Sequence, residues 1–340
     1  MNRGMTTLNR SLFGIALLAF LFGWPGSRES RDFPRTTVVG ERTFVTHNHL
    51  ARHYDFPRSR PDEGVLVLQN DRHRLVLASD SRRAELNGVT VWLHEPVLEE
   101  GRRWLIPEND VRRVIDPVLR PERHVHELGR RVVLLDPGHG GRDEGGRGAM
   151  GTLEKEMTLI VSLRVAERLR DAGQRVYLTR EDDRDVSLAE RVAQATELEA
   201  DLFVSIHFNT SANRDARGAE TFVLPAAGYA STANVEQAPN PPTASGNAYD
   251  GANMVLGYLI QKHLLNATGT EDRGVRRARF HVLREAVSPA VLVECGFLTN
   301  PREERKIHRA EYREQLARAI ADGILEYLGT ALRTQLDDAL

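Results

Sequence analysis

The chain has 340 residues, enough for about two domains, because a single hydrophobic core rarely grows beyond about 250 residues. Hydrophobic residues make up 41% of the chain and charged residues 28%, which excludes a mainly disordered chain, a collagen and a polytopic membrane protein. The 46 Lys and Arg residues balance 48 Asp and Glu residues, so the chain lacks the broad positive charge of nucleic-acid-binding proteins, and we expect no nucleic-acid partner. The single cysteine, Cys295, excludes an internal disulfide and a zinc site built from cysteines.

The first 30 residues carry the features of an export signal. Arg3 and Arg10 precede an apolar run over residues 11–24. A basic start followed by about 7–15 apolar residues is typical of a secretory signal, whereas a membrane span needs about 20. We therefore interpret residues 1–30 as a signal peptide and expect the protein to be exported, to the periplasm or cell envelope. A retained membrane anchor is the alternative, because no Ala-x-Ala cleavage site follows the run.

Residues 33–122 predict a small α+β domain. Short apolar or alternating runs at residues 65–68, 74–77 and 89–93 are typical of strands, and residues 108–115 favour a short helix. The segment LNGVTVWLHEPVLEEGRRWLIP, residues 86–107, resembles the copper amine oxidase N-terminal-like domain, a small module that often accompanies cell-envelope catalytic domains. The resemblance implies no copper chemistry. It leaves open whether this domain contacts the cell wall or an envelope activator.

From residue 131 to about residue 330 the pattern changes to alternating strands and helices. Apolar runs that predict strands lie at residues 132–135, 175–178, 202–206, 220–224, 280–283 and 290–293. Apolar residues recur every four positions from Met157 to Leu169, and Ser187 with Glu190 forms a capping box that begins another helix. Continuous apolar runs are typical of strands buried on both faces, so we predict a three-layer α/β domain with a mostly parallel central sheet.

A long polar stretch at about residues 225–256 interrupts this pattern. It is rich in Pro, Gly, Ser and Asn and is too long for a plain connection. It is either a disordered insertion or a lid beside the site, and the part from Asp250 onward is compatible with a helix of the domain itself.

Chemically active residues follow the predicted strands. His139 follows the run at residues 132–135, His207 follows 202–206, and Glu294 follows 290–293, while Glu154 lies at the start of a helix. In open α/β sheets, ligands bind beyond the carboxyl ends of the strands, so we expect these side chains to converge. Two imidazoles and one carboxylate are a preferred ligand set for catalytic zinc. From the residues alone, either glutamate could be the third ligand.

Five motifs in this half of the chain occur in an order that resembles a known family. They are DPGHGGRD at residues 136–143, Glu154-Lys155, Thr179-Arg180, SIHFN at 205–209 and VLVECGFLTNP at 291–301. Together they resemble the type 3 N-acetylmuramoyl-L-alanine amidases, zinc enzymes that cleave bacterial peptidoglycan. The similarity spans about residues 132–328 and implies a catalytic domain over 131–330.

The resemblance also implies roles for individual residues. His139, Glu154 and His207 match the family's zinc ligands, which implies one Zn²⁺ per chain, and Glu294 matches its catalytic glutamate. Arg180 and Asn209 match frequent family positions, and for both we expect loop capping and ion pairing. Cys295, where the family often has Leu or Thr, is expected to pack as a small buried hydrophobe.

The implied function is hydrolysis of the amide between N-acetylmuramic acid and L-alanine in peptidoglycan, during cell wall remodelling or cell separation. Two alternatives remain at this point: a zinc peptidase that acts within the stem peptide, and a catalytically inactive wall-binding protein. The preferred wall chemotype and the oligomeric state stay open.

Overall fold

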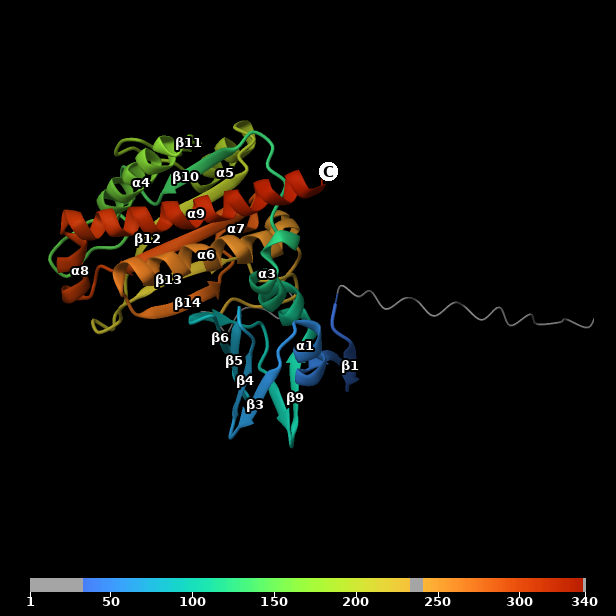
Figure 1. The fold of residues 1–340 in the computed structure, drawn as a ribbon. Helices are drawn as coiled ribbons and strands as arrows, with labels where there is room; N and C mark the ends of the chain where they lie inside the picture. The colour runs from blue at the N-terminus through green and yellow to red at the C-terminus, as the bar shows by residue number, and fades with distance from the viewer. Residues whose placement is uncertain (1–32, 233–240, 339–340) are drawn as a thin grey trace, which may run out of the picture.

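The computed structural model describes residues 33–232 and 241–338, so the predicted export segment over residues 1–30 lies outside the described residues. Figure 1 shows a larger body of sheet and helices, from which the β-rich N-terminal part projects. No helix among the described residues is long and apolar enough to cross a membrane.

The N-terminal part consists of two groups of short antiparallel strands. One four-stranded sheet has the order β1-β2-β9-β8, and the other group runs β7-β6-β5-β4-β3. The strands are β1 (Thr36–Val39), β2 (Arg42–Thr46), β3 (Arg58–Asp62), β4 (Val65–Gln69), β5 (Arg74–Ala78), β6 (Arg83–Leu86), β7 (Val89–Trp92), β8 (Leu98–Glu100) and β9 (Arg103–Pro107). In β4 and β5 every second residue is buried, as expected for strands with one face on the core.

Helical segments flank this part. They are α1 (His47–His53), α2 (Glu108–Asp110), a π-helical turn at Val111–Ile115 and α3 (Asp116–Leu119). The predicted helix over residues 108–115 is therefore present, and it continues into α3. Pro121–Arg123 forms a single 3-10 turn before the chain enters the larger body.

The larger body alternates strands and helices. Its strands are β10 (Val132–Pro137), β11 (Arg175–Leu178), β12 (Leu202–Asn209), β13 (Ala219–Val223), β14 (Asp272–Arg277) and β15 (Ala290–Phe297). Its helices are α4 (Glu154–Asp171), α5 (Leu188–Glu197), α6 (Asp250–Thr268), α7 (His281–Arg284), α8 (Pro301–Ile307) and α9 (Ala310–Asp338). The predicted capping box begins α5, with both reciprocal hydrogen bonds between Ser187 and Glu190 present.

The sheet of this body is mixed. Strands β11, β10, β12 and β15 are parallel neighbours, whereas β13 is antiparallel to β15 and β14 is parallel to β13. The predicted α/β class is confirmed, with a sheet that is less uniformly parallel than the apolar runs suggested.

One predicted strand is wrong. Residues 280–283 lie in and next to α7, and the strand of this region is β14. The sequence of β14, DRGVRR, is polar, so a search for apolar runs does not find this strand. Its arginines fit into the sheet because buried acceptors hold them. The apolar residues Val282 and Leu283 instead bury the inner side of a single helical turn.

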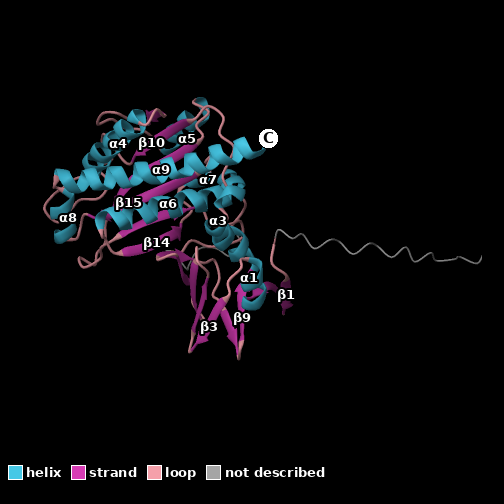
Figure 2. Cartoon of the chain, in the orientation of Figure 1, coloured by secondary structure: helices cyan, strands magenta, loops and turns pink. Residues whose placement is uncertain are grey.

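Helices cover both faces of the sheet (Figure 2), and a hydrophobic cluster lies on each face. Residues of α4, α6 and α9 join one hydrophobic cluster, and Ala195 of α5 with Val282 and Leu283 of α7 joins the other. The strands contribute to both in alternation: Val133 of β10 enters the first cluster and Leu134 the second. This alternation gives the three-layer architecture.

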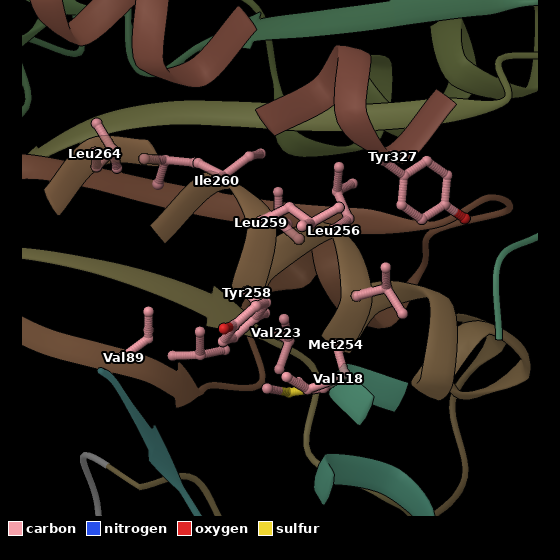
Figure 3. Close-up of a cluster of buried hydrophobic side chains, with 14 of the residues drawn as sticks. Val89, Val118, Val223, Met254, Leu256, Tyr258, Leu259, Ile260, Leu264 and Tyr327 are labelled. Atoms are coloured by element: carbon pink, nitrogen blue, oxygen red, sulfur yellow. The ribbon is translucent and has the colours of Figure 1, made fainter. Parts of the chain in front are cut away.

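The N-terminal part continues the central sheet. β7 pairs in parallel with β14 through Val91 and Val275, so one sheet of 11 strands runs from β11 to β3. The hydrophobic core is also shared. Figure 3 shows part of it, with Val89 of β7 and Val118 of α3 in the same cluster as Met254 of α6.

A buried polar group joins the two parts at His94. Its Nδ1 lies 2.7 Å from Asp110 Oδ1, and its Nε2 lies 3.0 Å from Arg277 Nε and 3.1 Å from the backbone nitrogen of Ala226. Burial, reinforced by the charge of Arg277 and opposed by Asp110, lowers the pKa of His94 to about 4. The ring is therefore neutral at pH 7, with Nδ1–H donating to Asp110 and Nε2 accepting from Arg277 and Ala226.

The polar stretch at residues 225–256 is partly ordered. Residues 225–232 and 241–244 are irregular, Ser245–Tyr249 forms a 3-10 turn, and α6 begins at Asp250. Residues 233–240 lie outside the described residues. Because Ala226 donates to His94, the beginning of the stretch is tied to the N-terminal part.

Candidate functional site

The strand ends bring the predicted site residues to one face of the sheet. Phe203 of β12 and Leu292 of β15 point into the core under α5 and α7. Since side chains alternate along a strand, His207 and Asn209 of β12 and Glu294 of β15 lie on the same face. His207 and Glu294 are direct partners across the parallel pair.

Three of these side chains converge closely. One carboxylate oxygen of Glu154, Oε1, lies 3.1 Å from His139 Nε2 and 2.9 Å from His207 Nδ1. One potential ligand atom from each residue lies within 4.8 Å of the others, and the two imidazole rings meet edge to face with centroids 4.9 Å apart. Two imidazoles and a carboxylate at this spacing form a set that a single divalent cation can bridge.

Backbone amides and a carboxylate orient this group. The amides of Gly146 and Phe208 donate to Glu154 at 2.7 and 3.1 Å. His139 Nδ1 lies 2.9 Å from Asp143 Oδ2, so its other nitrogen faces the centre of the group. Metal-binding histidines in proteins are commonly held in this way by a carboxylate on the second nitrogen.

The same contacts shift the pKa values of the group. Burial alone would raise the pKa of Glu154, but hydrogen bonds from both histidines outweigh it and hold the pKa far below its usual range. For His139, burial is outweighed by the hydrogen bonds and charges of Glu154 and Asp143, and its pKa is raised.

Two buried arginines hold the turn that carries His139. Arg180, which is fully buried, donates to the carbonyl oxygens of Pro137 at 3.0 Å and Gly138 at 2.8 Å. Arg191 donates to the carbonyl of His139 at 2.8 Å and forms an ion pair with the buried Asp136. His139 itself has φ of +61°, a conformation that needs such support in a non-glycine residue. The structure thus places Arg180 beneath the site, outside the residues that line its cavity.

Glu294 is an isolated carboxyl beside this group. It is 9% exposed, and its Oε2 has no hydrogen-bond partner among the described residues. Burial, together with the negative charges of Glu154 and Glu220, raises its pKa well above the usual value. A buried carboxyl without partners is costly and is typical of a group kept for chemistry. Cys295 points to the opposite core and is fully buried, and burial raises the pKa of its thiol.

Asn209 is linked to a residue that the sequence motifs did not single out. Its Nδ2 donates to Oε1 of Glu220 on β13 at 2.5 Å. Glu220 is only 3% exposed and is paired with Arg273 and Arg276 of β14. The sequence offered one indication, because Glu220 is a charged residue at the start of an otherwise apolar run. Its arginine partners lie on β14, the strand that the apolar runs did not predict.

One cavity of about 720 Å³ lies at the carboxyl ends of the parallel strands. His139, Glu154, His207, Asn209 and Glu294 all contribute to its wall. Its apolar wall comes from Val186, Leu188, Phe208, Phe280, Val282 and Leu292. Arg142 and Asp185, paired at 3.0 Å, lie among its exposed residues. The cavity thus combines a candidate cation site, a carboxyl and an apolar wall, as substrate-binding clefts do.

Comparison with known proteins agrees with these motifs. Residues 133–326, more than half of the chain, match the family described as N-acetylmuramoyl-L-alanine amidase. The chain is 37% identical over 197 residues to the N-acetylmuramoyl-L-alanine amidase LytC of Bacillus subtilis (strain 168), which covers 58% of this chain and 35% of LytC. It is 35% identical over 221 residues to AmiA of Escherichia coli (strain K12), covering 58% of this chain and 76% of AmiA. The chain therefore spans about a third of the length of LytC.

Solved structures give the same result. The catalytic domain of CwlV, an N-acetylmuramoyl-L-alanine amidase from Bacillus (Paenibacillus) polymyxa var. colistinus, is 35% identical with a TM-score of 0.50, and the match covers 59% of this chain and 99% of that domain. AmiC2 of Nostoc punctiforme is 36% identical with a TM-score of 0.50, covering 59% and 98%. The fold, the motifs and the family match together lead to one conclusion: the chain belongs to the type 3 N-acetylmuramoyl-L-alanine amidase family.

Proposed function

We propose that this protein is an exported, zinc-dependent amidase that hydrolyses the bond between N-acetylmuramic acid and L-alanine in peptidoglycan. The observation that carries the proposal is the convergence of ligand atoms of His139, Glu154 and His207 within 4.8 Å. Beside them lies Glu294, whose Oε2 has no hydrogen-bond partner in the part of the chain that the structure describes. Family membership supports the reaction, because the matched relatives are named for it.

The donor set fits zinc. Imidazole nitrogens and a carboxylate oxygen are ligands that zinc accepts, and a site with three protein ligands keeps a position for water or substrate. His139 would contribute Nε2, because Asp143 occupies its Nδ1, and His207 would contribute Nδ1, which faces Glu154. When bound, zinc supplies Lewis-acid polarisation of the scissile carbonyl and activation of a water molecule.

Glu294 is the proton carrier of the proposed reaction. Its carboxylate takes a proton from the attacking water as the new C–O bond forms, and it returns that proton to the nitrogen as the C–N bond breaks. The products are a free lactyl carboxyl group and a free amine on L-alanine. Burial favours the protonated form that the second step requires. A divalent cation held next to it would favour the ionised form that the first step requires.

Two features of the molecule support the proposed substrate and its location. The cavity has room for the atoms around a peptide bond, with an apolar wall along one side. The apolar N-terminal run is typical of an export signal, and peptidoglycan lies outside the cytoplasmic membrane. We therefore propose action on the cell wall, in its remodelling or in cell separation.

Mass spectrometry of muropeptides tests the proposal. Purified sacculi are incubated with the full chain, with and without a chelator, and we expect release of intact stem peptides that begin with L-alanine only when zinc is present. Release of shortened peptides would instead support a peptidase, and the absence of any product with zinc restored would support an inactive wall-binding protein.

A further inference from the structure

The side-chain amide of Asn209 is held in one orientation. Its Nδ2 lies 2.5 Å from Oε1 of Glu220. An ionised carboxylate can only accept hydrogen bonds, so the NH₂ group of Asn209 must face Glu220 and its Oδ1 must face away. Glu220 therefore determines that the oxygen of the Asn209 amide, and not its nitrogen, faces the cavity. The shape of the amide alone does not distinguish these two ends.

Glu220 is itself fixed by two arginines. Its Oε2 lies 3.1 Å from Arg273 Nε and 2.8 Å from Arg276 Nη1, and only 3% of the residue is exposed. Both arginines belong to β14, the strand next to β13. With Oε2 held by two guanidinium groups and Oε1 by Asn209, the carboxylate has little freedom to turn.

The oxygen of Asn209 is free for a ligand. Asn209 lines the 720 Å³ cavity, and none of the described residues donates a hydrogen bond to its Oδ1. The site therefore presents a fixed hydrogen-bond acceptor, which selects for an N–H or O–H group on the bound molecule.

The position of this acceptor relates it to Glu294. Glu294 is the direct partner of His207 on one side and of Glu220 on the other. Asn209 pairs with Phe297 beyond a register shift, but its hydrogen bond to Glu220 ties it to the residue opposite Glu294, and Asn209 and Glu294 line the same cavity. In the proposed function, Glu294 delivers a proton to the nitrogen of the scissile amide, so that nitrogen must come close to this side of the cavity.

We propose that Asn209 Oδ1 accepts a hydrogen bond from the N–H of the scissile amide, with Glu220 as the positioning residue that orients Asn209. This inference rests on the proposed function and adds a residue that recognises the leaving group. With its N–H held by Asn209, the nitrogen keeps the lone pair that develops on it free for the proton that Glu294 delivers in the proposed function. The interaction selects amides over esters, because an ester oxygen carries no hydrogen.

Two substrates and one variant test the role of Asn209. The substrates are N-acetylmuramoyl-L-alanyl peptide and its analogue with L-lactate in place of L-alanine, which has an ester at the cleaved bond. In Asn209→Ala we expect the ratio of kcat/KM for the amide to that for the ester to fall about three- to tenfold relative to the wild type, the size of one neutral hydrogen bond. Unchanged thermal unfolding and zinc content are the controls for folding. An equal loss on both substrates would show a purely structural role and overturn the inference.

A binding measurement separates this inference from the proposed function. In chelator-treated protein nothing is hydrolysed, so the affinities of the two substrates can be compared directly by calorimetry. We expect the wild type to prefer the amide and Asn209→Ala to lose that preference; equal preference in both proteins contradicts the role of Asn209. Failure of the zinc-loaded wild type to cleave either substrate contradicts the proposed function instead.

Glu220→Gln tests the positioning step. Glutamine can donate as well as accept, so it no longer imposes one orientation on Asn209. We expect the amide-to-ester ratio of this variant to fall toward that of Asn209→Ala, with zinc content retained. An unchanged amide-to-ester ratio in a folded Glu220→Gln protein would show that Glu220 does not orient Asn209.

Discussion

At the scale of single residues, the proposed function assigns cation binding and proton transfer to different side chains of the site. His139, Glu154 and His207 share contacts through one oxygen, whereas Glu294 lies beside them with a free oxygen. Substitution of a proposed cation ligand should therefore remove both the metal and turnover, whereas substitution of Glu294 should remove turnover alone.

We expect Glu294→Gln to retain zinc and to lose turnover by at least about 100-fold, since the amide cannot carry the proton between water and nitrogen. His139→Ala should lose both zinc and turnover, because it removes one of three ligands. Metal analysis and release of stem peptides from sacculi measure the two properties. Full turnover by Glu294→Gln would remove it from the mechanism, and one zinc per chain in His139→Ala would show that the ligand assignment is wrong.

Asp143 should influence the site through His139. Its carboxylate holds His139 Nδ1 at 2.9 Å and so fixes the direction of Nε2. Asp143→Asn should weaken zinc affinity about 10- to 100-fold, the usual effect of removing a supporting carboxylate. Competition with a zinc-binding dye measures this affinity. Asp171→Asn, at the exposed end of α4, is a matched control that should bind zinc as the wild type does.

At the scale of elements, the loop after β10 must pass very close to β12. A Cβ added to Gly138 would lie 2.2 Å from Cε1 of His207, closer than any real contact, so one of the two must move. Only glycine lets the β10 loop and the His207 ring share this space.

Gly138→Ala should therefore displace His207, and we expect loss of zinc binding in a protein that still folds. Gly129→Ala is the control, because its Cβ would lie 3.5 Å from the nearest atom, an ordinary contact. Zinc stoichiometry and circular dichroism distinguish the two outcomes. Normal zinc binding by Gly138→Ala would mean that the ring can shift without consequence.

The sequence predicts an element when the residues of that element form a recognisable local pattern, such as an apolar run or a capping box. The apolar runs predicted β10, β12 and β15, and the Ser187 capping box predicted α5. The position of His139, Glu154 and His207 at one sheet edge followed from strand order and the family motifs. β14 could not be predicted, because its arginines are held by partners such as Glu220 and His94, which are distant in sequence. The Glu220–Asn209 pair could not be predicted either, because its geometry depends on these arginines of β14.

At the scale of the whole molecule, the two parts meet through His94 as well as through the sheet. His94 is neutral in the folded protein because its pKa is lowered to about 4 by burial and by Arg277. Its ordinary pKa of about 6.5 applies in the unfolded chain. Between these values the unfolded chain binds the additional proton, so the stability contributed by neutral His94 is present above about pH 6.5 and is lost as the pH falls toward 4.

We therefore expect the free energy of unfolding to decrease by a few kcal/mol between pH 7 and pH 4 on account of this residue. Urea unfolding of the wild type and of His94→Asn at several pH values isolates the effect, because asparagine does not titrate. The decrease should be smaller in His94→Asn, and identical pH profiles for the two proteins would argue against a neutral, buried His94.

The continuation of the central sheet into the N-terminal part has a practical consequence. If the catalytic unit were excised at about residue 130, the outer edge of β14 would lose its strand partner and the side of α6 that packs against β7 and α3 would face solvent. Unpaired strand edges and bare apolar surfaces favour aggregation. A shortened version of this chain should therefore keep residues 33–122, because they pair with β14 and share the hydrophobic core of α6.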